Sequence, residues 1–230
     1  MNTEILLEKE QLQAVFISKV YGWMSAALVI TGVVAMWAAS TPAVQQAIFS
    51  GTTMIPFYIL IAAEFGAVIY LSARINKMSA ETAGIVFLLY SVLNGLTLSM
   101  VFLIYTSSSI ASTFLVTAAT FGVMSAYGYI TKRDLTSIGN LAFMGLIGLI
   151  IASVVNMFLQ SEIMYWVITY AGVLIFVALT AYDTQKIKRM ASFDDSQEDY
   201  KKKSILGALT LYLDFVNLFL YLLRFMGNRK

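Results

Sequence analysis

Long stretches without any charged side chain constrain this sequence more than any other feature. Residues 20–63, 82–131, 135–161 and 163–182 contain no Asp, Glu, Lys or Arg. A helix that crosses the hydrocarbon core of a bilayer needs about 20 predominantly apolar residues. Only 12% of the chain is charged, against about 25% in an ordinary soluble domain, so too few charges remain to cover a soluble surface. The pattern predicts a helical membrane protein.

Turn-forming residues divide the two longest of these stretches, at residues 40–53 and 106–109. Together with the apolar segment 204–224, which Asp214 interrupts, the division predicts an all-α integral membrane protein with seven transmembrane helices, at residues 20–39, 55–74, 82–104, 111–130, 138–158, 163–186 and 204–224. We therefore expect a cytoplasmic tail at residues 1–19, a membrane domain at 20–224 and a short carboxyl-terminal tail at 225–230.

The basic residues indicate how the chain is oriented. With the amino terminus in the cytoplasm, the inner segments contain twelve of the fifteen Lys and Arg residues, and the predicted outer loops contain none. Short loops rich in Lys and Arg stay on the cytoplasmic side. The other three, Arg224, Arg229 and Lys230, fall at the carboxyl end, which seven spans place on the outer side of the membrane. If residues 204–224 formed a re-entrant loop, this end would be cytoplasmic too.

The absence of His and Cys excludes several chemistries. A Ser-His-Asp triad, a His-based zinc site, a thiol nucleophile and a disulfide all require one of these residues. Every Lys is predicted at an interface or in a loop, which disfavours an intramembrane Ser-Lys hydrolase. We expect no resident cofactor and no tightly bound metal. The net charge of +2, spread over separate loops, gives no support for a nucleic-acid partner.

Three acids remain inside the predicted spans: Glu64, Asp183 and Asp214. A charged side chain at the centre of a span costs about 2.5 to 3.5 kcal/mol, so it normally has a partner or a function. Asp214 shares one helix face with Thr210 and Asn217. A polar face at this depth points at protein or water, so we expect the last helix to be central. A face that only joins helices by hydrogen bonds is the alternative.

Asp183 lies towards the cytoplasmic end of the sixth span. If the sixth and seventh helices are neighbours, Asp183 and Asp214 meet, and two carboxylates in contact do not both ionise cheaply. Such a pair senses pH, because its proton decides whether the two helices attract or repel. The alternative for Asp183 is an ordinary hydrated residue at a helix end.

Arg74 lies at the inner end of the second span, ten residues after Glu64. Its guanidinium either reaches the interface and marks topology or acts as a latch that pairs with the acids. For Glu64 the alternatives are a water-filled cavity, a cation contact, or a protonated acid bonded to Asn94 or Thr97. Glu64, Asn94 and Asn217 are therefore candidates for an ion path.

Small residues recur every four positions in two of the spans. They are Ala118, Gly122 and Ala126 in the fourth span, and Gly148 and Ala152 in the fifth. Such spacing lets helix backbones approach closely. It predicts helix-packing surfaces with no chemical role.

Three motifs carry a resemblance to a known family: Ala-Tyr-Asp-Thr-Gln-Lys-Ile-Lys at 181–188, Leu-Tyr-Leu-Asp-Phe-Val-Asn-Leu-Phe-Leu at 211–220, and Tyr-Gly-Tyr-x-Thr-Lys-Arg-Asp-Leu at 127–135. With them, the chain resembles the Bax inhibitor-1 (transmembrane Bax inhibitor motif) family, in its bacterial inner-membrane branch. The resemblance implies seven helices around a central last helix and a pH-sensitive calcium leak without enzyme activity. It also implies an aspartate pair as proton sensor (Asp183 and Asp214), an arginine latch (Arg74) and an ion-path acid (Glu64).

Two functions compete at this point. The first is a proton-gated calcium leak in the bacterial inner membrane, with Ca2+ and protons as transient ligands, because oxygen ligands suit this hard cation. The second is an interaction protein that restrains other membrane proteins, such as a membrane-bound protease or a cell-death regulator. The cytoplasmic tail and the polar segment 188–203, predicted to be a solvated loop, motivate the second function.

Overall fold

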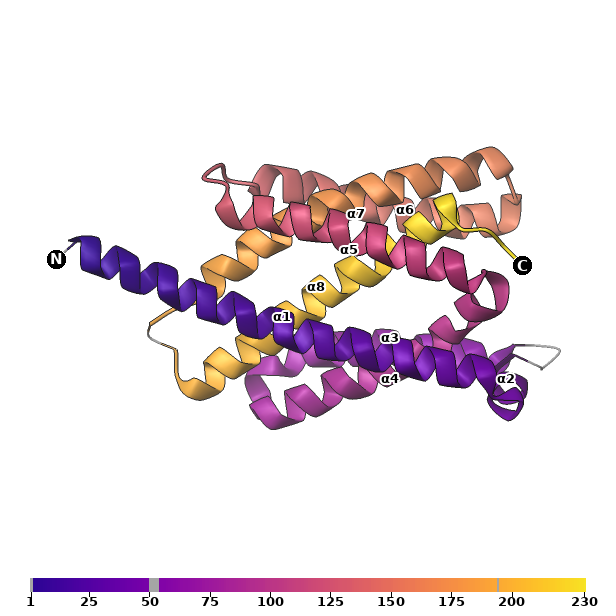
Figure 1. Cartoon of the computed structure of the whole chain (residues 1–230), viewed down its shortest axis with the longest axis horizontal. Coiled ribbons are helices and arrows are strands. Elements are labelled where there is room, and N and C mark those ends of the chain that lie inside the picture. The colour runs from indigo at the N-terminus through magenta and orange to yellow at the C-terminus, as the bar shows by residue number, and fades with distance from the viewer. Residues whose placement is uncertain (1, 50–53, 194) are drawn as a thin grey trace. The chain divides into compact units, whose positions relative to one another are not determined.

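The computed structural model describes residues 2–49, 54–193 and 195–230, with backbone only for residues 2–6. Its α-helices are α1 (Asn2–Ser40), α2 (Pro42–Phe49), α3 (Ile55–Arg74), α4 (Ala80–Ile104), α5 (Ser107–Ile130), α6 (Thr136–Leu159), α7 (Glu162–Met190) and α8 (Gln197–Met226), and the 3-10 helix η1 (Ile75–Lys77) follows α3 (Figure 1). Seven of the described helices, all except α2 and η1, are long and apolar enough to cross a membrane. This confirms the predicted all-α, seven-span fold.

The observed helices follow the predicted spans closely, and α3 coincides with residues 55–74. The largest differences are in α1 and α8. α1 begins at Asn2, so most of the predicted tail continues the first helix, and the side chain of Phe16 is fully buried. Its ring packs edge-on against Tyr200 of α8, with 5.2 Å between ring centroids. The division into a tail and a membrane domain stays a prediction.

The last helix, α8, is unbroken from Gln197 to Met226. A re-entrant loop needs a turn inside this segment, so the continuous helix favours a full span. α8 is also the most deeply buried of the seven: 61% of its most apolar stretch is buried, against 6% for the candidate span Ile55–Lys77. Deep burial is what we expect of a helix that others surround.

The predicted turn at 40–53 contains a short helix, α2, which is a correction to the sequence analysis. Pro42 favours this helix because proline has no N–H to lose in the first turn and its backbone angle is already helical. Residues 50–53 of that turn lie outside the described residues, as does Asp194 of the polar segment 188–203.

The polar segment 188–203 is only partly a loop, because α8 begins within it. Glu198 in the first turn of α8 accepts a hydrogen bond from the backbone N–H of Ala80, at 2.6 Å, and so satisfies a free donor at the start of α4. Lys203 forms an ion pair with Asp195 at 2.5 Å. These contacts correct the prediction of a fully solvated loop.

The chain divides into two compact units. Unit 1 contains the described residues of 1–105 and 190–212 with Lys230, and unit 2 contains residues 106–189 and 213–229. In unit 1, α1 packs along α4. The two helices lie close together at Gly95 of α4, where an added Cβ would lie 2.7 Å from the Cβ of Val34. Only glycine allows this approach.

In unit 2, α5 and α7 are in backbone contact at Gly128, where an added Cβ would overlap the carbonyl group of Ala181. The small residues singled out in the sequence do not behave in this way. A Cβ added at Gly122 or Gly148 would meet nothing within 4 Å, and both positions are exposed. The predicted packing surfaces are therefore wrong at these glycines, because spacing alone does not say which face of a helix meets a neighbour.

Candidate functional site

Asp183 of α7 and Asp214 of α8 lie together in unit 2. Both side chains are buried, with 8% and 4% of their surface exposed. Their carboxyl groups interact through a side-chain hydrogen bond. Sequence reasoning required the sixth and seventh spans to be neighbours for this contact, and the structure brings the two acids together.

The surroundings of the pair supply little compensating charge. Lys186, one turn further along α7, attracts the carboxylate of Asp183 without forming an ion pair. Thr180 and Thr184 use their hydroxyl groups elsewhere: Thr180 donates to the carbonyl of Phe176, and Thr184 donates to Ser125 at 3.3 Å. The Oδ2 atom of Asp214 is buried and has no hydrogen-bond partner among the described residues.

This arrangement has a direct chemical consequence. A hydrogen bond between two carboxyl groups needs a proton on one of them, because two carboxylates only accept. Two carboxyl groups in contact titrate as a pair, so a change in protonation belongs to both residues together. Loss of the proton replaces a hydrogen bond by repulsion between two charges at short range. The unpartnered Oδ2 atom also leaves one oxygen available to a water molecule or a cation.

Glu64 of α3 is half-buried in unit 1 and has two neutral partners on α4. The amide of Asn94 donates to its Oε2 atom at 3.0 Å, and the hydroxyl of Thr97 donates to its Oε1 atom. Of the alternatives derived from the sequence, this geometry matches the acid bonded to Asn94 and Thr97.

The bonds around Glu64 continue across unit 1. Tyr212 of α8 donates to the Oδ1 atom of Asn94 at 3.0 Å, and its hydroxyl oxygen lies 2.7 Å from that of Thr31 on α1. Thr31 in turn donates to the carbonyl of Ser91 at 2.9 Å. Glu64, Asn94, Tyr212 and Thr31 thus form one connected network between four helices, which we call the Glu64 network.

The other predicted site residues have simpler surroundings. Arg74 is exposed at the end of α3 and forms no ion pair among the described residues of unit 1. Its role as a latch stays a prediction. Asn217 is half-buried, and its amide donates to the carbonyl of Leu213 in its own helix at 2.8 Å. Its place on an ion path also stays a prediction.

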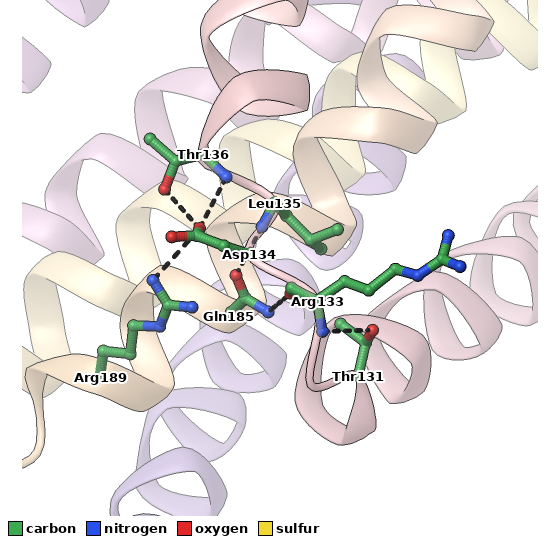
Figure 2. A network of polar contacts seen from close by, with 7 residues as sticks. All are labelled: Thr131, Arg133, Asp134, Leu135, Thr136, Gln185 and Arg189. Atoms are coloured by element: carbon green, nitrogen blue, oxygen red, sulfur yellow. Dashed lines mark hydrogen bonds and ion pairs between the residues drawn. The ribbon is translucent and has the colours of Figure 1, made fainter.

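A second polar cluster holds the α5–α6 connection against α7 (Figure 2). Gln185, two residues after Asp183, accepts a hydrogen bond from the N–H of Leu135 at 2.9 Å and donates to the carbonyl of Arg133 at 2.8 Å. Asp134 accepts from Thr136 and pairs with Arg189 at 3.4 Å. The hydroxyl and N–H groups of Thr136, followed by the charge of Arg189, lower the pKa of Asp134.

The members of these clusters that sequence reasoning missed include Thr31, Tyr212 and Gln185. Each is a single uncharged polar side chain in a spanning helix, and such residues are common there. Tyr212 and Gln185 gave a signal, because each lies in a motif that carries the family resemblance, whereas Thr31 gave none. Without the fold, nothing separates a connecting hydroxyl from one that bonds its own helix.

Comparisons with known proteins agree on one family. A family model described as inhibitor of apoptosis-promoting Bax1 matches residues 13–230. The inner membrane protein YbhL of Escherichia coli K12 is 54% identical over 217 residues, which cover 94% of this chain and 92% of the relative. An uncharacterized protein of Borreliella burgdorferi is 46% identical, with 99% and 95% covered. One from Rickettsia prowazekii is 45% identical, with 94% and 90% covered.

Proposed function

The chain belongs to the Bax inhibitor-1 family, and from that premise we propose that it is a pH-sensitive calcium leak of the bacterial inner membrane. The Asp183–Asp214 pair binds the proton that controls the leak. The observation that carries this proposal is the contact between two buried carboxyl groups on different helices. Nothing else among the described residues of unit 2 combines burial, charge and a contact between helices in this way.

The mechanism follows from the charge of the pair. With one proton, the hydrogen bond holds α7 against α8. Without it, two negative charges repel each other and favour separation of the helices. With a second proton, the pair is neutral and no longer attracts a cation. On the strength of the resemblance, Arg74 is the candidate latch whose pairing depends on these states.

Calcium suits the ligands that the membrane domain offers. Ca2+ prefers carboxylate and carbonyl oxygens and takes six to eight of them in a stable site. The described residues contain no group of three or more acids close enough to hold a metal ion. Asp183 and Asp214 together, and Glu64 separately, offer fewer oxygen ligands than a stable Ca2+ site needs. They suit brief contacts with a passing Ca2+ ion better than tight binding.

The test is calcium flux into liposomes that contain the purified protein, measured over a series of pH values. We expect the parent to show a pH-dependent leak, and Asp183→Asn and Asp214→Asn to lose most of that dependence, because an amide cannot release the controlling proton. Asp134→Asn is the matched control, since Asp134 is an exposed acid of the same unit and its variant should follow the parent. Parent-like pH curves in both pair variants would refute the sensor.

We further propose that the amino terminus is cytoplasmic and the carboxyl terminus periplasmic. The basic residues of the predicted inner segments support this orientation. Reporter fusions at residue 230, active only in one compartment, test it. Cytoplasmic activity of that fusion would contradict an odd number of spans.

A second candidate function is an interaction protein that modulates other membrane proteins, such as a membrane-bound protease or a stress regulator. The matching family, which is described as an inhibitor of apoptosis-promoting Bax1, favours it. Crosslinking in intact membranes followed by purification is the test. A stoichiometric partner whose loss reproduces the phenotype of deleting this chain supports the idea, and recovery of the chain alone counts against it.

A further inference from the structure

When Glu64 is ionised, the side chains of the Glu64 network have one donor hydrogen fewer than the number of hydrogen bonds between Glu64 and the carbonyl of Ser91. We propose that Glu64 is a second proton-binding site, and that its proton reverses the direction of the hydrogen bonds through Asn94 and Tyr212 to Thr31. This inference is independent of the leak, because it concerns only where a proton binds and how the neighbouring groups respond.

The polar contacts follow one another in a single chain of possible hydrogen bonds, which we call the line. Beyond the bond between Glu64 and Asn94, the line runs from Asn94 to Tyr212, from Tyr212 to Thr31, and from Thr31 to the carbonyl of Ser91, over distances of 2.7 to 3.0 Å. Asn94, Tyr212 and Thr31 are buried, and Tyr212 has no exposed surface. Because water does not reach these hydroxyl groups readily, each must find its partner within the line.

An ionised Glu64 fixes one direction. The carboxylate only accepts, so the NH2 group of Asn94 faces it, and the Oδ1 atom of Asn94 accepts from Tyr212. The single hydrogen of Tyr212 is then used. Thr31 donates either to Tyr212 or to the carbonyl of Ser91, but its one hydrogen does not serve both contacts. One contact of the line stays unfilled.

A protonated Glu64 fixes the opposite direction. Its hydroxyl donates to the oxygen of Asn94, once the amide has turned over about its terminal torsion, which has two nearly equivalent positions. The NH2 group of Asn94 then donates to Tyr212, Tyr212 donates to Thr31, and Thr31 donates to the carbonyl of Ser91. All four contacts are filled, and Thr97 still donates to the other oxygen of Glu64.

Few other groups compete for control of this proton. Among the described residues, the titratable side chains on which the charge of Glu64 acts are two phenols, Tyr90 of α4 and Tyr212 of α8. α1 contributes Thr31 to the line, and α2 has no titratable residue. No Lys or Arg of the described part of unit 1 forms an ion pair with Glu64. The line of neutral groups is therefore the main partner of the acid.

The experiment is infrared difference spectroscopy of the purified protein in lipid, recorded from about pH 4 to about pH 9. Glu64→Gln identifies the carboxylic-acid band of Glu64, because that band alone is lost. Thr31→Val leaves Tyr212 without an acceptor only when Glu64 is protonated. An unsatisfied buried donor costs about 1 to 3 kcal/mol, and here the cost falls on the protonated state of Glu64 alone. Glu64 should therefore lose its proton, and the band should disappear, at a pH at least about 0.7 lower than in the parent. This shift is about a fivefold change in proton concentration.

Two controls separate the line from a general effect on packing. Ser99→Ala removes another fully buried hydroxyl of unit 1, one that bonds only its own helix, and should leave the band unchanged. Thr31→Ser keeps the hydroxyl and should restore the parent behaviour if Thr31→Val folds poorly.

The decisive comparison repeats Thr31→Val in a Tyr212→Phe background. Without the phenol hydroxyl, Thr31 and Asn94 are disconnected, so the substitution should no longer move the band. An equal shift in both backgrounds overturns the relay, and the absence of any band that depends on Glu64 overturns the proton site. Neither result bears on calcium flux, so failure here is distinct from failure of the proposed function.

Discussion

The contact between α5 and α7 at Gly128 gives the sharpest prediction about the fold. A Cβ added at Gly128 would lie 2.9 Å from the carbonyl carbon and 3.0 Å from the Cα of Ala181, and still closer to the carbonyl oxygen. Carbon atoms pack at about 3.5 to 4.0 Å, so the two helices must separate by about 1 Å. The atoms in the way are backbone, and no side-chain rotation relieves the overlap.

Overpacking of this kind costs about 1 to 3 kcal/mol. Gly128→Ala should therefore lower the free energy of unfolding by that amount. Gly122→Ala is the matched control: it lies in the same helix, and its added methyl group meets nothing within 4 Å. Removing a glycine from a helix is worth up to about 1 kcal/mol, so this variant should be as stable as the parent or slightly more stable.

The assay is denaturant or thermal unfolding of both variants in the same detergent, followed by circular dichroism. Because Ala181 lies two residues before Asp183 on α7, separation of the helices should also alter the pH dependence of the leak in Gly128→Ala alone. Equal stability of the two variants would refute the close contact on which this reasoning depends.

Two further predictions concern the contacts between the α5–α6 connection and α7 in unit 2. Gln185→Ala removes both side-chain hydrogen bonds to the backbone at residues 133 and 135. At about 1 kcal/mol for each bond, the substitution should lower the stability of the fold by about 2 kcal/mol. The amide of Leu135 should exchange its hydrogen faster than in the parent, and an unchanged exchange rate would contradict this prediction. The lowered pKa of Asp134 means that the folded state binds its proton less readily than the unfolded state, so the stabilisation is present at neutral pH and is lost as the pH falls through the lowered value. Asp134→Asn should accordingly reduce the melting temperature at pH 7 but not in acid, and a loss that is the same at both pH values argues against this sign.

The helices could be predicted from the sequence because the bilayer imposes their length and excludes charge. Six spans follow from four charge-free stretches and two turns, and the seventh, 204–224, follows from an apolar segment that Asp214 interrupts. The bounds of α3 coincide with the predicted residues 55–74. The acid pair could also be predicted, since a buried carboxyl group needs a partner and only three were present. These results depend on strong, local physical rules.

The remaining features depend on which helix faces meet. Gly122 and Gly148 have the four-residue spacing of a packing surface, but they lie on helix faces that meet no neighbour within 4 Å. Gly128 has no distinctive spacing, yet α5 contacts the backbone of α7 there. Thr31 and Tyr212 are ordinary residues of apolar helices until the fold brings them to Asn94. The early start of α8 was missed because its first turn is charged, and Glu198 is stabilised there by a contact with distant Ala80.

The most direct test of the central claim is the pH dependence of calcium flux in Asp214→Asn compared with the parent, in liposomes of identical composition. Asn keeps the shape of the side chain and donates a hydrogen bond to Asp183 at every pH. We expect the flux of this variant to change little across the pH range in which the flux of the parent changes. A variant curve that follows the parent across that range would contradict the claim that the shared proton controls the leak.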